Sequence, residues 1–300
     1  MKTLIITDTW DVTSDIIIGR LMDSSFRLNT DIIRDYVIIW DSDGFTISNP
    51  DGNSIKLSEI GSVYWRKPFT SALYSDTSGE DYFFYSECRY MIREIYNVAK
   101  MRGAHSLVEE GAERKVGKLM QLLIAEDYFH VPAWRLISGS DFHSPDRTVV
   151  KSLSGEALDS EHVLYTTDIS NKTLDSNYAW FTQDLVNKRA DITVCYVDGE
   201  IFSFELPVSN PDNDWRTTLN SPETQDWQPV VLDPNYVEKI RSFMERCALR
   251  FGRIDFVSDG IDLWFLEVNP NGQWAWLDIN DEYGLITSML KAIQGHRIRK

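Results

Sequence analysis

The chain has 300 residues and a formal net charge of −16, with 30 Lys and Arg against 46 Asp and Glu. No basic stretch offsets this charge, which argues against a general binder of nucleic acid or of anionic membranes. Three widely spaced cysteines fit neither a disulfide framework nor a zinc site, and no apolar run is long enough to span a membrane. These features predict a globular protein of the reducing cytoplasm.

Short apolar runs separated by turn residues open the chain. They predict a buried strand at residues 4–6, further strands at residues 37–40, 45–47 and 62–65, and a helix at residues 16–22. A longer helix is predicted at residues 82–101, where Cys88, Ile92 and Ile95 recur at helical spacing. Strands that alternate with helices predict a small α/β lobe over roughly the first hundred residues.

The rest of the chain combines helices with strands that turn back on themselves. One helix is predicted at residues 113–127, with Met120 and Leu123 on its apolar stripe. Two strands joined by Asp198-Gly199 predict a β-hairpin, and the polar stretch at residues 207–229 predicts a long ordered loop. Further strands are predicted at residues 135–137, 148–152, 192–197 and 201–206, and further helices at residues 234–250 and 283–293.

Three oxygen-bearing side chains stand on two short apolar runs near the C-terminus. Glu267 and Asn269 are two residues apart and therefore share a face of a strand, and Asp255 lies on the preceding run. Oxygen ligands without His or Cys suit Mg²⁺, which needs few protein ligands because substrate phosphates supply the rest. The alternative is that these are ordinary strand-end and turn residues.

A metal site requires a particular register between the two runs. A two-residue turn at Asp259-Gly260 would pair Asp255 with Trp264 and would place Glu267 on the wrong face. We therefore predict a loop centred near Ile261, or a bulge that restores the register.

Two lysines upstream could meet phosphate groups. Lys151 ends an apolar strand and leads into a loop with Ser154 and Gly155, whose amides could cradle a phosphate. Lys118 lies on the preceding predicted helix and could reach the same phosphates. Each lysine alone could equally be a solvated surface charge.

A hinge and an arginine complete the ordered set. Backbone groups of a connecting strand typically hold adenine, and residues 181–188 fit that position, with Asp184 proposed for the ribose hydroxyls or, as an alternative, as a capping residue. Arg216, in the polar loop, could clamp a phosphate or acyl phosphate bidentately. The nucleotide-binding residues predicted from this hinge are Gln183, Asp184, Leu185, Val186 and Lys188.

This order of residues resembles that of the ATP-grasp ligases. The individual motifs are similar to those of the graspetide (microviridin-type) peptide-modifying ligases. The resemblance spans nearly the whole chain and rests on residues 27–31, 63–68, 118–122, 151–155, 183–188, 214–216 and 265–274. It implies an α/β (α+β) fold with an N-terminal pre-ATP-grasp domain at residues 1–104. A central ATP-grasp subdomain with the Lys151 loop would follow at residues 105–186, and a C-terminal subdomain with the metal-binding strands at residues 187–300.

The chain departs from the family pattern at three positions. After the hinge the family usually reads acidic-aliphatic-Arg, whereas this chain has Asp191-Ile192-Thr193. An arginine there would help to position a phosphate or the substrate carboxylate, so Thr193 leaves that role open. Gly117 replaces the usual Asn before the helix lysine, and Asp184 replaces the usual hinge Glu.

The resemblance implies a reaction as well as a fold. ATP would phosphorylate an Asp or Glu side chain of a ribosomal precursor peptide, and a Ser/Thr hydroxyl or Lys amine would close an ω-ester or ω-amide ring, releasing ADP and phosphate. Asp255, Glu267 and Asn269 would hold two Mg²⁺ ions, and Lys118, Lys151 and Arg216 would neutralise the remaining charge. The resemblance also implies a leader sequence on the peptide and a homodimer.

Two alternatives stay open. The same fold could join small carboxylates or amino acids to free amines. In another class, the chain could be a non-catalytic nucleotide-binding adaptor, although a scaffold has no need of the paired acidic residues.

Overall fold

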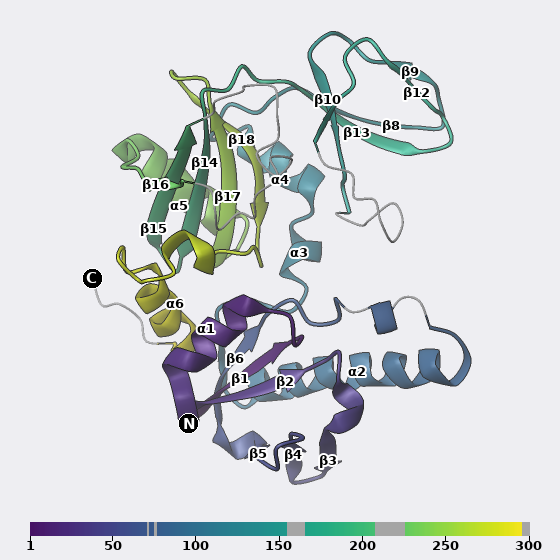
Figure 1. Ribbon diagram of the computed structural model, residues 1–300, viewed down its shortest axis with the longest axis vertical. Helices are drawn as coiled ribbons and strands as arrows, with labels where there is room; N and C mark the ends of the chain where they lie inside the picture. The colour runs from purple at the N-terminus through teal and green to yellow at the C-terminus, as the bar shows by residue number, and fades with distance from the viewer. Residues whose placement is uncertain (71, 75–76, 155–165, 208–225, 296–300) are drawn as a thin grey trace.

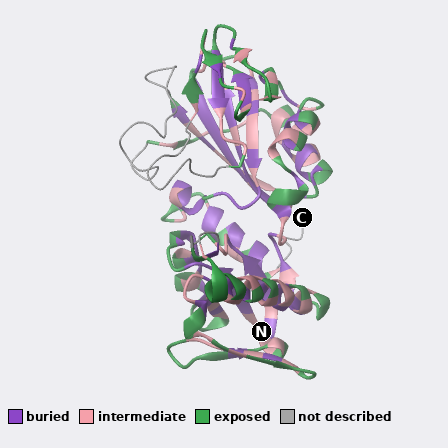
Figure 2. Ribbon diagram, turned by 90° about the vertical axis from the view of Figure 1, so that its right-hand side faces the viewer, coloured by how far each residue is buried: buried purple, intermediate pink, exposed green. Residues whose placement is uncertain are grey.

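The computed structural model describes residues 1–70, 72–74, 77–154, 166–207 and 226–295. These residues form an elongated molecule in which an N-terminal lobe lies below two sheets of different size (Figure 1). Buried residues run along the strands of both the lobe and the larger sheet, and exposed residues cover their outer surfaces (Figure 2).

The N-terminal lobe is an α/β unit built on a four-stranded parallel sheet in the order β2-β1-β6-β7. Alternation along β1 sends Leu4 and Ile6 into a core with Ile92 of helix α2, and Ile5 into a core with Ile17 of helix α1. The sheet therefore has helices on both faces, as parallel sheets require. The elements are β1 (Lys2–Thr7), α1 (Val12–Leu21), β2 (Ser25–Asn29), β6 (Ile60–Trp65), α2 (Gly79–Met101) and β7 (His105–Ser106), with an antiparallel sheet of β3 (Val37–Asp41), β4 (Gly44–Ser48) and β5 (Ser54–Lys56).

The smaller upper sheet is antiparallel, in the order β11-β10-β13-β8. Its elements are β8 (Trp134–Ser138), β10 (Thr148–Lys151), β11 (Thr167–Asp168) and β13 (Ala179–Asp184), with β9 (Phe142–His143) and β12 (Thr173–Leu174) as a separate pair. Helices α3 (Ala112–Lys115) and α4 (Lys118–Ala125) precede it.

The larger upper sheet carries the predicted metal strands. It is antiparallel, in the order β16-β15-β14-β17-β18, with helix α5 packed on one face and helix α6 on the other. Helix α6 also packs against Tyr64 and Leu107 of the N-terminal lobe, so one core joins the two parts. The elements are β14 (Ala190–Val197), β15 (Glu200–Pro207), β16 (Gln228–Pro229), α5 (Pro234–Arg246), β17 (Phe251–Ser258), β18 (Leu263–Asn269) and α6 (Leu285–Gln294). Short 3-10 helices lie at Met22–Ser24, Ile33–Asp35, Leu57–Glu59, Ala72–Tyr74 and Ala275–Asp278.

Two hairpin predictions are confirmed. Asp198 and Gly199 both have positive φ angles, 47° and 101°, as a two-residue type I′ turn between β14 and β15 requires. Between β17 and β18 the turn is longer, since Ser258 pairs with Leu263. A bulge next to Asp255 then places this residue opposite Glu267, which is the register that the metal site needs.

The prediction of one continuous helix at residues 113–127 is wrong. It breaks at Gly117, whose ψ of 159° is extended, into α3 and α4. The break changes which side of the second piece faces the core: Leu122 and Ala125 are buried, whereas Met120 and Leu123 are exposed. Glycine has low helix propensity, and here its extended conformation begins a new helix.

Other expectations concern the cysteines, the long loop and membranes. Cys88, Cys195 and Cys247 are all buried free thiols, so no disulfide joins them. Most of the loop predicted at residues 207–229 lies outside the described residues. None of the helices within the described ranges is long and apolar enough to cross a bilayer. The domain boundaries at residues 104 and 186 stay predictions.

A fully buried arginine joins the N-terminal lobe to the turn that follows β18. Arg66, directly after β6, donates to the carboxylate of Asp11 at 3.3 Å and to Oδ1 of Asn271 at 2.9 Å. It also donates to Oε1 of Gln273 at 2.6 Å and to the carbonyl of Gly272 at 3.2 Å. This buried charge is therefore paired and hydrogen-bonded on several sides, as burial of a charge requires.

Substitution of Arg66 by Met should lower the free energy of unfolding by about 3–5 kcal/mol, because the buried carboxylate of Asp11 would lose its counter-charge and the carbonyls of Asn271 and Gly272 would lose a donor. Arg34→Met is the control, since Arg34 pairs with Asp81 on the surface, and it should cost much less than the substitution of Arg66. Urea denaturation of both variants measures the difference, and equal losses would contradict the role of Arg66.

Candidate active site

The predicted metal ligands lie on one face of the larger sheet. Thr193, Asp255 and Glu267 are direct partners across β14, β17 and β18 and form one row. Cys195, Arg253 and Asn269 form the next row of the same face. The opposite face of these strands is apolar and packs against α5. Because side chains alternate between the two faces of a strand, the same strands supply both the core and the polar face.

Asp255 is held by two donors. Thr193 Oγ1 donates to Oδ1 at 3.0 Å, and Arg253 Nη2 donates to Oδ2 at 2.9 Å. Sequence reasoning found Asp255 but not these two partners. The spacing Arg253-x-Asp255 on a strand was a usable signal, because residues two apart share a face.

Glu267 lies between a lysine and an amide. Lys118 Nζ is 3.4 Å from Oε2, and Asn269 Nδ2 donates to Oε1 at 3.1 Å. The same lysine donates to the carbonyl of Ser152 at 2.9 Å, directly after β10. Lys118 therefore connects β18, which carries two predicted metal ligands, to the loop that follows Lys151. The prediction that Lys118 and Lys151 could reach the same phosphates needs this proximity.

Helix α4 is fixed beside β18 by a buried glutamine. Gln121 Oε1 accepts from the backbone N–H of Val268 at 2.9 Å, and its Nε2 donates to the carbonyl of Val116 at 2.9 Å. These bonds set the position of Lys118, which is one turn before Gln121 on the same helix.

The donor set fits Mg²⁺ only in the company of further oxygens. No group of three His, Cys, Asp or Glu side chains that could hold a metal occurs in the part of the chain that the structure describes. Asp255, Glu267 and Asn269 supply two carboxylates and one amide. Mg²⁺ commonly binds one or two carboxylates plus phosphate oxygens and water, so this set suits a metal–phosphate complex.

The smaller sheet presents a second set of predicted residues. Lys151 pairs with Phe181, and Val149 pairs with Gln183, so Lys151 and Gln183 share a face. Phe181 of that face belongs to the core beneath the metal strands. Gln183 is 2% exposed, and neither its Nε2 nor its Oε1 has a hydrogen-bond partner in the part of the chain that the structure describes. A buried amide without partners is costly and indicates a polar ligand.

The hinge residues have different surroundings. Arg147 donates to the carbonyl of Leu185 at 3.3 Å, and the N–H of Leu185 donates to the carbonyl of Arg147 at 2.7 Å. The backbone of Val186 makes no such bond within the described residues. Asp184 is exposed, with Arg135 at 3.8 Å. Within the described residues, Val186, Asn187 and Lys188 are therefore the hinge positions whose backbone groups make no hydrogen bond and are available to a base.

Lys188, predicted for the nucleotide, has an acidic partner. Its Nζ is 3.0 Å from Oδ2 of Asp191, and both side chains are 10% exposed. Asp191 is two residues before Thr193 and lies on the same face of β14. Sequence reasoning noted Asp191 only as part of a departure from the family pattern. Its spacing of two residues from Thr193 on a strand was a usable signal that both lie on the face of the predicted metal ligands.

Three predicted residues lie at or beyond the edge of the described chain. Arg216 and Gly155 are outside the described residues, and Ser154 is an exposed residue at the end of one described range. Their predicted roles stay predictions.

The thiol nearest to the metal face is not a nucleophile. Burial raises the pKa of Cys195 to about 12, with a smaller opposing effect from the charge of Arg253. A neutral, fully buried thiol is unreactive near neutral pH. Among the six residues of the two rows on the polar face, none is therefore a cysteine nucleophile. These residues supply charges and hydrogen-bonding groups.

Solved structures share this fold over almost the full length of the chain. The macrocyclase MdnC of Microcystis aeruginosa, bound to its precursor peptide MdnA, has a TM-score of 0.76 at 20% sequence identity, with 98% of this chain and 100% of that chain covered. A RiPP-associated ATP-grasp ligase of Chryseobacterium gregarium, in complex with ADP and a leader and core peptide, has a TM-score of 0.75 at 17% identity, covering 100% and 98%. The ATP-grasp ligase PsnB, complexed with minimal precursor, Mg and ADP, has a TM-score of 0.70 at 14% identity, covering 97% of each chain.

A small-molecule enzyme is a weaker match. The D-cycloserine synthetase DcsG has a TM-score of 0.53 at 10% identity, with 98% of this chain and 99% of that chain covered. No protein-family model and no curated protein sequence matches the chain. The structural matches confirm the predicted fold class: this chain has the ATP-grasp fold, in the form found in peptide-modifying ATP-grasp ligases.

Proposed function

We propose that the chain is an ATP-dependent ligase that activates Asp or Glu side chains of a ribosomal precursor peptide and closes ester or amide rings. The observation that carries this proposal is the pair Asp255 and Glu267, which oppose each other on one face with Lys118 beside them. Activation of the carboxylate as an acyl phosphate followed by attack of a hydroxyl or amine needs positioned charges rather than a protein nucleophile. The polar face offers such charges.

The residues present fit Mg²⁺ and a nucleotide. Asp255, Glu267 and Asn269 form an all-oxygen set that needs phosphate oxygens to complete it. Gln183 is a buried amide without a hydrogen-bond partner among the described residues and would meet the base edge, and Val186 lies in the adjoining hinge. Bound Mg-ATP would supply the phosphoryl group that activates the carboxylate.

The remaining site residues have narrower proposed roles. Lys118 and Lys151 would hold phosphate oxygens, with loop amides from Ser154 and Gly155. Asp184, Leu185 and Lys188 would border the nucleotide. Arg216 would neutralise the acyl phosphate. In cells the enzyme would work in the cytoplasm, as a homodimer.

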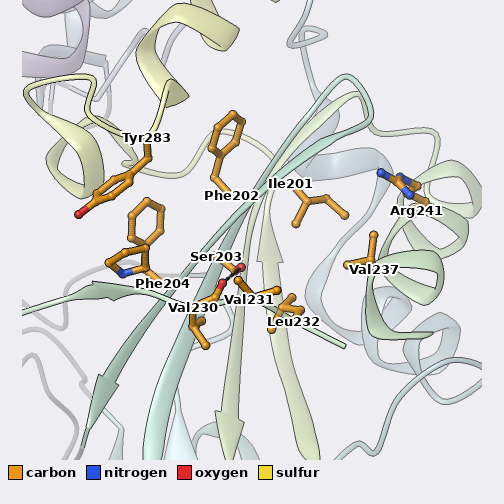
Figure 3. A pocket seen from close by; sticks show the side chains of 11 residues that line it. Ile201, Phe202, Ser203, Phe204, Val230, Val231, Leu232, Val237, Arg241 and Tyr283 are labelled. Atoms are coloured by element: carbon orange, nitrogen blue, oxygen red, sulfur yellow. Dashed lines mark hydrogen bonds between the residues drawn. The ribbon is translucent and has the colours of Figure 1, made fainter. Parts of the chain in front are cut away.

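An apolar groove offers a place for the part of the peptide that is not modified. It has a volume of about 340 Å³ and lies between β15, α5 and residues 229–232, with Arg241 at one end and Tyr283 at the other (Figure 3). Ile201, Phe204 and Val237 are among its apolar lining residues. One cation beside an apolar lining fits a peptide segment that has apolar side chains followed by an acidic one, and we propose the leader of the precursor peptide as the occupant.

The two other functions have less support. A ligase for small carboxylates would use the same charges, but the peptide-modifying enzymes match this fold with higher TM-scores than the D-cycloserine synthetase does. A non-catalytic adaptor would not need two opposed carboxylates with a bridging lysine.

The test of the function uses the short Thr-, Ser-, Lys-, Asp- and Glu-rich peptide expected to be encoded beside the gene. With ATP and Mg²⁺, the enzyme should give products lighter by whole multiples of one water, measured by mass spectrometry. Glu267→Gln should slow this reaction by about a hundredfold or more, because one metal ligand loses its charge. Glu282→Gln, an exposed loop residue, is the control and should leave the rate unchanged. An unchanged rate in the Glu267 variant would refute the metal assignment.

Gln183→Leu tests the nucleotide site. The variant removes an unpaired buried amide, so the free protein should become about 1–3 kcal/mol more stable. Binding of ADP should weaken about tenfold, because a hydrogen-bonding side chain to the base is lost. Thr182→Val is a close control, since Thr182 is also buried with an unpaired hydroxyl but points to the other face of β13. Titration calorimetry with ADP should separate the two variants, and equal ADP affinities would count against a nucleotide role for Gln183.

Arg241→Glu tests the groove. Reversal of the charge should weaken binding of the fluorescently labelled precursor peptide about tenfold or more while ADP binding stays unchanged. Arg246→Glu, the same substitution at an exposed position of α5, is the control. If both variants bind the peptide as well as the unmodified chain does, the leader docks elsewhere.

A further inference from the structure

The segment that follows the last predicted metal ligand has no role in the function proposed above. It begins with a closed β-turn, since the backbone N–H of Gly272 donates to the carbonyl of Asn269 at 3.1 Å. Pro270 stands at the second position of this turn, which suits its fixed φ angle. Pro270, Asn271 and Gly272 are all buried. A closed, buried turn leaves Asn269 little freedom to move relative to the residues that follow it.

Gly272 lies against Asn269 with no room for a side chain. A Cβ atom added at Gly272 would be 2.9 Å from Cβ of Arg253 and 3.1 Å from Cβ of Asn269. Carbon atoms in contact prefer about 3.5–4.0 Å, and a Cβ atom cannot move away by rotation of its own side chain. The φ angle of Gly272 lies outside the left-handed region, so the backbone conformation does not require glycine here. Space alone requires it, and a methyl group would displace Asn269 or Arg253.

The N-terminal lobe holds the other side of the turn. Asn271 is 4% exposed, and its Oδ1 accepts from Nη1 of Arg66 at 2.9 Å. Its Nδ2 donates to the carbonyl of Trp65, the last residue of β6, at 3.3 Å. Both polar atoms of this side chain are therefore bound by the N-terminal lobe, although Asn271 is only two residues from a predicted metal ligand.

A buried tryptophan anchors the end of the segment. Trp274 is fully buried and packs in one core with Ile5 of β1. Its Nε1 donates to the hydroxyl of Tyr64 in β6 at 3.4 Å. An indole buries a large apolar area and usually finds a partner for its N–H, so this residue fixes the chain firmly. The segment after Asn269 is thus held by the N-terminal lobe at two points.

We propose that the turn at residues 270–273, held by the N-terminal lobe, positions the metal ligand Asn269. This inference rests on the proposed ligase function and names Asn271 and Gly272 as positioning residues outside the ligand set. Mg²⁺ demands near-ideal octahedral geometry, so a small displacement of one ligand oxygen weakens its binding. Asn269 also donates to Glu267 at 3.1 Å, so its displacement would disturb a second ligand. The N-terminal lobe thereby sets the affinity for the metal without supplying a ligand.

The test measures how much Mg²⁺ contributes to the binding of ADP. The Kd for ADP is measured by titration calorimetry in Mg²⁺ and in EDTA, and the unmodified chain should bind at least about tenfold more tightly in Mg²⁺. Gly272→Ala should reduce this ratio about fivefold, and Asn271→Ala about threefold, because the metal geometry is disturbed. The Kd in EDTA should change less than about twofold, since the residues predicted to bind the base lie on the smaller sheet.

Matched substitutions control for the chemistry of each change. Gly19→Ala adds the same methyl group at an exposed position of α1, where nothing lies within 4 Å of the new atom, and should leave the ratio unchanged. Asn235→Ala removes an exposed amide on α5 and should also leave it unchanged. If Gly272→Ala folds poorly, Asn271→Ala alone decides the result, since it creates no clash.

A double substitution separates positioning from a general structural role. If Gly272 acts through Asn269, then in an Asn269→Ala background Gly272→Ala should cause no further fall in the ratio. A structural role would lower the free energy of unfolding, measured with urea, while the ratio for the folded protein stayed constant.

Two results would overturn the inference: an unchanged ratio in both Gly272→Ala and Asn271→Ala, or an equal further fall in the Asn269→Ala background. Failure of the unmodified chain to bind ADP, or binding that is independent of Mg²⁺, would contradict the proposed ligase function itself.

Discussion

The register between β17 and β18 is the constraint on which the candidate site depends. The turn alone would set Asp255 opposite Leu266, and the two carboxylates would then lie on opposite faces of the sheet. One extra residue at the bulge moves Glu267 into place. The core requires the same result, because the bulge pairs Ile254 with Val268, and both pack in the core with α5; without it Ile254 would lie opposite Glu267. Hydrophobic burial and site chemistry therefore impose one register.

The charges of this face are arranged in pairs, although the chain as a whole is strongly acidic. Asp255 has Arg253 and Glu267 has Lys118, each within 3.4 Å. The net charge of −16 thus says little about what the site binds, because local cations decide that. Lys118 also donates to the loop after β10, so the same lysine that pairs with Glu267 connects the two upper sheets.

Local patterns predicted the parts of the fold that local physics determines. Alternation and turn residues gave the strands, and Asp198-Gly199 gave its hairpin, since positive φ angles are required there. Spacing on a strand grouped Glu267 with Asn269. The break at Gly117 was missed, because glycine is also tolerated within helices and only tertiary packing decides the outcome. Partners far apart in sequence, such as Arg66 with Asn271, leave no local pattern, so the contact between the lobes could not be predicted.

That contact joins the N-terminal lobe to the candidate site. Arg66 is bound to the turn after Asn269, which is the last predicted metal ligand, so the position of the lobe and the position of that ligand are coupled. Thr193 stands where the family usually has an arginine, and a buried arginine on the neighbouring strand places its charge beside it. The carboxylate of Asp255 thus receives one hydrogen bond from the neighbouring strand β14 and one charged hydrogen bond from its own strand, so both oxygens are fixed by the sheet itself.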